Sequence, residues 1–177
     1  MKKGPASTFT ALVIGASLAL GTSAADASKA GRKQCLKTDP VRFEGTIVEA
    51  AIATPELSTL VNLVIAANLV DALNAPGNLT VFAPTDDAFA AIPEPVLGAI
   101  GSDVDVLTAV LTYHVTATPT DPRRSTKPRE VTTLQGQGVF VEYDGEPQIN
   151  QSTAACQAVR TDNGTVWLID SVLLPQF

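Results

Sequence analysis

Apolar positions recur at helical spacing through the first half of the chain. From Thr46 onwards the sequence IVEAAI predicts a first helix. A second helix is expected to begin at TPELS, residues 54–58, where Thr54 can serve as the N-cap and Pro55 fits the first helical position. The apolar pattern continues until NAPGN, residues 74–78, interrupts it. This half of the chain is therefore expected to be mainly helical.

A short apolar run and a turn follow. Leu79 to Ala83 predict a buried strand, and Thr85 is a candidate N-cap for the next helix, with Asp86 and Asp87 at its first two positions. An acid–base pair of carboxylates requires one raised pKa, whereas a helix N-terminus lowers the pKa of a nearby carboxyl group. Asp86 and Asp87 are therefore predicted to initiate the helix rather than to catalyse a reaction.

The character of the chain changes after residue 114. One more helix is expected over DVDVLTAVLTY, residues 103–113, with Ser102 as its N-cap. Strand signals then flank Asp144-Gly145 and Asn163-Gly164, two dipeptides that suit hairpin turns with positive φ, and SVLLP, residues 171–175, is predicted as a last strand. Helices followed by an antiparallel sheet indicate an α+β domain.

The N-terminus has the features of an export signal. Lys2 and Lys3 precede an apolar stretch over residues 11–20, and the small residues near Ala25 to Ala27 suit cleavage, so residues 1–27 are predicted to be a signal peptide. Residues 28–44 form a polar leader. No later stretch reaches the roughly 20 apolar residues of a membrane span. We expect a soluble protein in the periplasm or outside the cell.

Charge excludes some partners. Removal of Lys2, Lys3 and Asp26 from the 12 basic and 18 acidic side chains leaves 10 and 17, a formal charge of −7. An acidic surface repels nucleic acids and anionic lipids, so neither is expected to bind.

The mature chain contains two cysteines, Cys35 and Cys156. In an oxidising compartment such a pair predicts a disulfide. Two cysteines and one histidine leave no four-ligand zinc set, so no metal and no cofactor are expected.

Two segments resemble the signature boxes of the fasciclin domain. TVFAPTDDAFAAIP, residues 80–93, is similar to the first box, and VLTAVLTYHV, residues 106–115, is similar to the second. The resemblance implies a fasciclin domain over residues 45–177, with N-terminal helices packed on a wedge of about seven mostly antiparallel strands. It implies structural roles for the first-box residues Thr85, Asp86, Asp87 and Phe89. The family functions mainly in adhesion and matrix attachment and has no known catalytic chemistry.

Two groups of residues are candidates for binding. Tyr113 and His114 end the second box: His114 is predicted to be a buried, hydrogen-bonded imidazole, and by resemblance the pair is also a candidate receptor contact. The proline-rich segment 116–130 carries the second group, which is either simply solvated or a contact for an acidic polysaccharide or protein: Arg123, Arg124, Lys127 and Arg129.

Three functions are compared. The first is a non-catalytic secreted protein that mediates adhesion or matrix association through a surface protein or an acidic polysaccharide. The alternative is an extracytoplasmic carrier that holds a small apolar ligand between the helices and the sheet. An enzyme ranks last, because the chain has no G-x-S-x-G elbow and no cysteine predicted beside a base.

Overall fold

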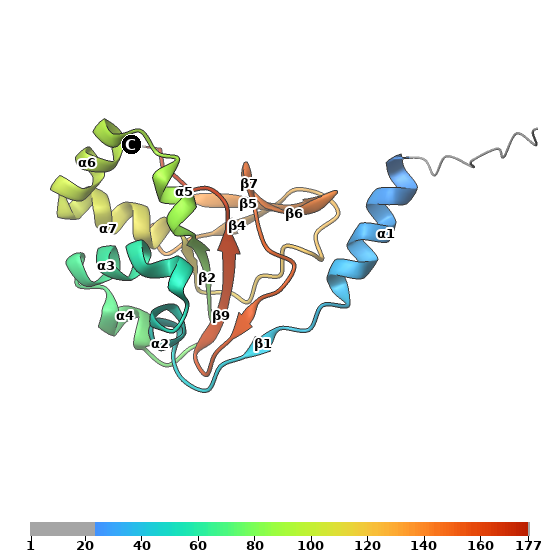
Figure 1. The fold of residues 1–177 in the computed structure, drawn as a ribbon, viewed down its shortest axis with the longest axis horizontal. Coiled ribbons are helices and arrows are strands. Elements are labelled where there is room, and N and C mark those ends of the chain that lie inside the picture. Colours follow the sequence, from blue (N-terminus) through green and yellow to red (C-terminus); the bar gives the residue numbers. More distant parts are fainter. Residues whose placement is uncertain (1–23, 177) are drawn as a thin grey trace, which may run out of the picture.

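The structure is a computed structural model, and it describes residues 24–176. The helices between residues 47 and 113 cluster on one side of the central strands, whereas the helix over Ala24–Leu36 and a second sheet lie on the other side (Figure 1). The α+β prediction is confirmed. The helices are α1 (Ala24–Leu36), α2 (Ile47–Ile52), the 3-10 turn η1 (Pro55–Leu57), α3 (Ser58–Ala66), α4 (Val70–Asn74), α5 (Asp86–Ala90), α6 (Glu94–Ser102) and α7 (Val104–Tyr113). The strands are β1 (Val41–Arg42), β2 (Leu79–Pro84), β3 (Val115–Thr116), β4 (Arg129–Thr132), β5 (Gly138–Asp144), β6 (Glu146–Ile149), β7 (Ser152–Thr153), β8 (Val159–Arg160) and β9 (Gly164–Ile169).

The strands form two sheets. One has the order β1-β8-β9-β2-β3 and the other β4-β5-β6-β7. Most pairings are antiparallel, as predicted, but β1 with β8 and β2 with β9 run parallel. Residues 24–176 contain nine strands rather than about seven. The excess consists of two-residue strands such as β3 and β7, which are too short to produce an alternating pattern in the sequence.

The two central strands, β2 and β9, separate two hydrophobic cores. Val81 of β2 and Val166 of β9 face the helices, whereas Phe82 and Trp167 face the core shared with the second sheet. Both faces of these strands are buried, which explains why residues 79–83 are apolar on both faces apart from Thr80.

Local capping decides where several helices begin. Thr46 and Glu49 form a reciprocal capping box at the start of α2. Thr85 accepts a hydrogen bond from the backbone N–H of Ala88 and caps α5. The prediction of Ser102 as an N-cap is wrong: Ser102 still belongs to α6, and the carboxylate of Asp103 caps α7.

Two further sequence predictions are corrected at the C-terminal end. Residues 171–175 form no strand. Both hairpins exist, but of the four turn residues only Gly145 has positive φ, at 79°. Gly164 is needed for space instead, because a Cβ there would clash with the carbonyl oxygen of Leu79 and lie 2.7 Å from Cδ1 of Ile47.

The polar leader is in contact with the rest of the chain. The predicted disulfide is confirmed: Cys35 at the end of α1 is bonded to Cys156, with Cα atoms 5.1 Å apart. Strand β1 adds to the edge of the five-stranded sheet, and Arg32 of α1 donates hydrogen bonds to the carbonyl oxygens of Arg123 and Arg124. Residues 1–23 of the predicted signal peptide lie outside the described residues, and the predicted cleavage region, residues 25–27, falls within α1. The proposed boundary at residue 45 stays a prediction.

Within residues 24–176 no single helix has the length and apolar character to cross a membrane. Helices α6 and α7 reach that length only together, and they are bent by 106° at the break.

Candidate functional site

Asp86 joins two helices. Its carboxylate accepts hydrogen bonds from the backbone N–H of Thr59 (2.8 Å) and from the hydroxyl of Ser58 (2.7 Å), at the start of α3. These hydrogen bonds, the Thr59 N–H first, lower the pKa of the Asp86 carboxyl group. A carboxylate held in its ionised form at a helix start is unsuited to donating a proton near neutral pH.

The other first-box residues have simpler environments. Asp87 is exposed in the first turn of α5, where its charge faces the positive end of the helix dipole. Phe89 is buried in the core between the helices and the sheet. No hydrogen bond runs from the Asp87 side chain to the second box among the described residues.

His114 is enclosed at the end of α7, and both ring nitrogens are occupied. Nδ1 lies 2.7 Å from the carbonyl oxygen of Val110, and Nε2 accepts a hydrogen bond from the backbone N–H of Leu173 (2.9 Å). This arrangement fits the neutral tautomer that carries its proton on Nδ1. Burial lowers the pKa of His114 to about 4, although the hydrogen bond to Val110 acts in the opposite direction. The imidazole therefore ties α7 to the C-terminal segment and has no free nitrogen for a substrate.

Tyr113 is also interior. Its hydroxyl donates a hydrogen bond to the carbonyl oxygen of Gly138 and accepts one from the Asn150 side chain, each at 3.2 Å. Its ring lies in the core between the two sheets. With 5% of Tyr113 and 2% of His114 exposed, neither side chain can contact a receptor unless the fold opens.

Arg123 is the most highly connected of the predicted cations. One Nη donates to three backbone carbonyl oxygens, those of Cys35, Thr38 and Cys156. The guanidinium also pairs with Asp121 at 2.9 Å and stacks 4.9 Å from the ring centre of Trp167. Burial of Asp121 acts to raise the pKa of its carboxyl group, but hydrogen bonds and charge from Arg123 outweigh it and the pKa is lowered.

Arg123 therefore does not belong with the exposed contact candidates. Its side chain is 9% exposed, and its donors are directed at the disulfide-linked leader and the loop that carries Cys156. The sequence around Arg123 does not predict its burial, because the carbonyl groups that Arg123 contacts belong to residues far away in the sequence.

The remaining three cations are exposed. The side chain of Arg124 is 79% exposed and shares Asp121 at 3.2 Å, while Lys127 and Arg129 are exposed without an ion pair among residues 24–176. Arg129 begins the edge strand β4, so the basic segment is partly a strand rather than wholly a loop.

Two of these cations, Arg124 and Arg129, line an open groove of about 650 Å³. Leu36 and residues 38–40 of the leader form one wall, several residues between Pro119 and Arg129 form another, and the β8–β9 hairpin contributes Arg160. Arg160 was not among the sequence-derived candidates, since it lies 31 positions after Arg129 and reaches the groove only through the pairing of β8 with β1 and β9.

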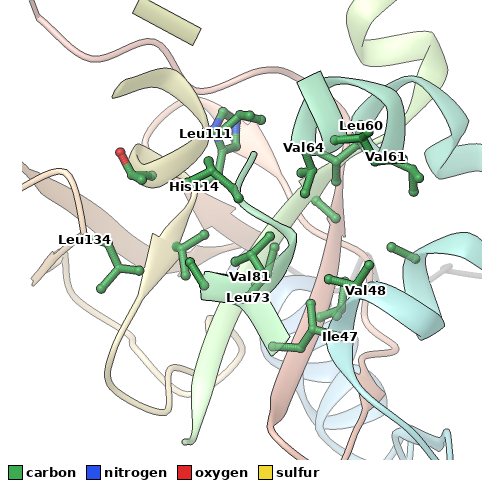
Figure 2. A pocket seen from close by; sticks show the side chains of 18 residues that line it. Ile47, Val48, Leu60, Val61, Val64, Leu73, Val81, Leu111, His114 and Leu134 are labelled. Carbon is green, nitrogen blue, oxygen red and sulfur yellow. The ribbon is translucent and has the colours of Figure 1, made fainter. Parts of the chain in front are cut away.

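A second, smaller space lies between the helices and the five-stranded sheet. It measures about 60 Å³, its accessible lining is apolar, and Figure 2 shows Val64, Leu73 and Val81 turned towards it. Ile65 and Leu134, two of the exposed large hydrophobic residues, also line it. The alternative carrier hypothesis placed its ligand in this part of the fold.

No group of three or more His, Cys, Asp or Glu side chains is placed to hold a metal ion within the part of the chain that the structure describes. The described residues thus form an α+β domain with a cationic groove, a small apolar cavity beside the five-stranded sheet and a fully hydrogen-bonded histidine.

The comparisons with known proteins identify the family. The fasciclin domain family model matches residues 55–175. The chain belongs to the fasciclin domain family, and the predicted resemblance is confirmed.

Relatives of similar size support this assignment. The immunogenic protein MPB70 of Mycobacterium bovis is 38% identical over 148 residues, which cover 78% of this chain and 75% of that protein. The cell surface glycolipoprotein MPB83 of the same species is 37% identical over 135 residues, covering 73% of this chain and 60% of that protein.

A solved structure supports the fold. The FAS1 domain pair of the insect cell adhesion molecule fasciclin I superimposes with a TM-score of 0.53 at 14% identity, covering 74% of this chain and 51% of that one. At this level of identity the likeness concerns the fold alone.

Proposed function

We propose that this protein is exported and associates with a cell surface or matrix through contacts made without catalysis. The observation that carries the proposal is the cationic rim, defined as the exposed residues Arg124, Lys127 and Arg129 of one short segment, on a chain with a formal charge of −6. Cations concentrated on one edge of an acidic protein attract an acidic polysaccharide or an acidic protein surface.

Three other features support this function. The disulfide is typical of proteins outside the cytosol. The relatives are named as an immunogenic protein and a cell surface glycolipoprotein, and the structural neighbour as a cell adhesion molecule. His114 has both nitrogens bonded to backbone groups and offers no general base.

The test is direct binding to cells. Fluorescently labelled protein, residues 28–177, is titrated onto washed cells and onto their extracted surface polysaccharide. A variant with Arg124, Lys127 and Arg129 changed to Ser loses three charges. A matched control loses three exposed charges elsewhere, through substitution of Lys29, Lys33 and Lys37 by Ser.

Saturable binding that is lost in the rim variant and kept in the control supports the proposal. Absence of binding by the folded wild type contradicts surface association. Binding that both variants retain equally moves the contact away from the rim.

The apolar cavity favours a second candidate, a carrier of a small apolar ligand. An engineered apolar cavity of about 150 Å³ stays dry and binds benzene, so a space of about 60 Å³ must widen to hold a comparable molecule. Native mass spectrometry of gently extracted protein should then reveal a bound apolar metabolite. Protein without such a mass, and without stabilisation by benzene in a melting assay, argues against the carrier.

A further inference from the structure

The cationic groove combines charge with surfaces of several kinds. Arg124, Arg129 and Arg160 line it together with the carboxylate of Asp39. Hydroxyl groups are supplied by Thr38, Ser125 and Thr165, and flat apolar surfaces by Pro40 and Pro119. Its volume of about 650 Å³ falls within the range of roughly 300–1,000 Å³ that is typical of ligand sites.

The charges in the groove are unequally engaged. The guanidinium group of Arg123 is paired with Asp121 and hydrogen-bonded to three carbonyl oxygens, and Arg124 forms an ion pair with the same carboxylate. Arg129 and Arg160 have neither an ion pair nor a side-chain hydrogen bond within residues 24–176, and both are exposed. Two guanidinium groups are thus available to a ligand that brings its own oxyanions.

The rest of the lining favours a carbohydrate. Hydroxyl and carboxylate groups can exchange hydrogen bonds with sugar hydroxyls, and proline rings offer apolar surface to the C–H faces of sugar rings. Because the groove has only two free guanidinium groups, it suits a sugar chain whose negative charges are well separated.

The whole-molecule charge argues against denser polyanions. Duplex DNA carries about one charge per 1.7 Å of its axis, and a chain with a formal charge of −6 repels such a polymer over most of its surface. A sugar chain with at most one carboxylate on each ring experiences less of this repulsion while it still reaches the two free arginines.

We infer that the groove between the leader and the β8–β9 hairpin binds an acidic oligosaccharide through its carboxylates, with Arg129 and Arg160 as the pairing residues. This inference deepens the proposed surface association and rests on it. It assigns ligand binding to Arg160, a residue outside the basic segment 116–130.

The experiment uses trigalacturonate as the probe and its fully methyl-esterified form as a matched neutral sugar. Calorimetric titration of the protein, residues 28–177, should give an affinity for the triacid about tenfold higher than for the ester. Changing both Arg129 and Arg160 to Ser should lower the affinity for the triacid about tenfold. Changing Lys29 and Lys33 to Ser removes the same charge from α1 and should leave the affinity unchanged.

Several results would overturn the inference. These are equal affinities for the triacid and its ester, unchanged binding in the Arg129 and Arg160 variant, and tighter binding of a sulfated oligosaccharide of the same length. Melting curves are measured for all variants, and only variants that melt as folded proteins are compared.

The cell-binding assay separates this inference from the broader function. If the Arg129→Ser, Arg160→Ser variant still binds cells and the wild type does not bind trigalacturonate, surface association is supported and the saccharide site is refuted. If the wild type binds trigalacturonate but no cells, the groove stands and the proposed surface association fails.

Discussion

Acidification should destabilise this protein through a single buried histidine. His114 is the only histidine in the chain, and its neutral ring is held between the carbonyl oxygen of Val110 and the backbone N–H of Leu173. A proton added to Nε2 would face the Leu173 N–H, which is itself a donor. The bond between α7 and the C-terminal segment would then be lost.

The size of the effect follows from the two pKa values. The pKa of His114 is about 4 in the folded state, against 6.5 for an ordinary histidine. Between these values the unfolded chain binds a proton that the folded chain does not. The stabilisation is therefore complete above pH 6.5 and is lost as the pH falls towards 4, by about 3 kcal/mol in total. That is a large fraction of the roughly 5–15 kcal/mol by which domains are stable.

Urea unfolding between pH 7 and pH 4.5 measures this loss. Between pH 6.5 and 5 most carboxylates are still ionised, so His114 should dominate the slope. The variant His114→Gln does not titrate, and its free energy of unfolding should decline with falling pH less steeply than that of the wild type, by up to about 1.4 kcal/mol per pH unit. The wild type should remain more stable at neutral pH.

The histidine can also be followed directly. Its ring proton resonances in NMR spectra report one titration without overlap, because no second histidine exists. A midpoint at pH 6 or above would refute the reasoning, as would identical slopes for the wild type and His114→Gln.

Three further predictions concern stability. The Cys35–Cys156 disulfide closes a loop of 121 residues, so its reduction should lower the free energy of unfolding by about 4–5 kcal/mol and Tm by on the order of 10 °C. A calorimetric melting curve that reductant leaves unchanged would contradict this prediction. Arg123→Lys cannot reproduce the contacts with three carbonyl oxygens and Asp121, and it should cost about 3 kcal/mol in urea unfolding; a loss below about 1 kcal/mol would show that the network is not stabilising. In urea unfolding, Gly164→Ala should lower the free energy of unfolding by at least about 2 kcal/mol, because the added Cβ clashes with β2. The control Gly98→Ala lies in an open part of α6 and should raise the free energy of unfolding by about 0.5–1 kcal/mol; the reverse order would show that β2 and Gly164 are not in close contact.

Features that depend on neighbouring residues could be predicted from the sequence. Thr85 begins a helix because its hydroxyl reaches an N–H three residues ahead, and residues 79–83 read as a buried strand because every position is apolar or small. The T-x-x-E spacing of Thr46 and Glu49 is an equally local signal of a capping box.

Features that depend on distant partners could not be predicted. Ser102 and Asp103 are both good N-caps, and the choice between them depends on how far α6 continues. Strand β1 consists of Val41 and Arg42 alone, and it exists because β8, more than a hundred residues later, offers a free edge. Two residues carry no periodicity from which such a strand could be recognised.

The basic segment shows the same limit at the candidate site. Arg123 and Arg124 are adjacent and chemically identical, yet one is 9% exposed at the side chain and the other 79%. The difference arises because the carbonyl groups of Cys35 and Cys156 converge on Arg123 once the disulfide and β1 hold the leader against the domain. Substituting both arginines together would therefore mix a loss of folding with a loss of binding. Only the exposed set, with Arg160 added, tests the surface alone.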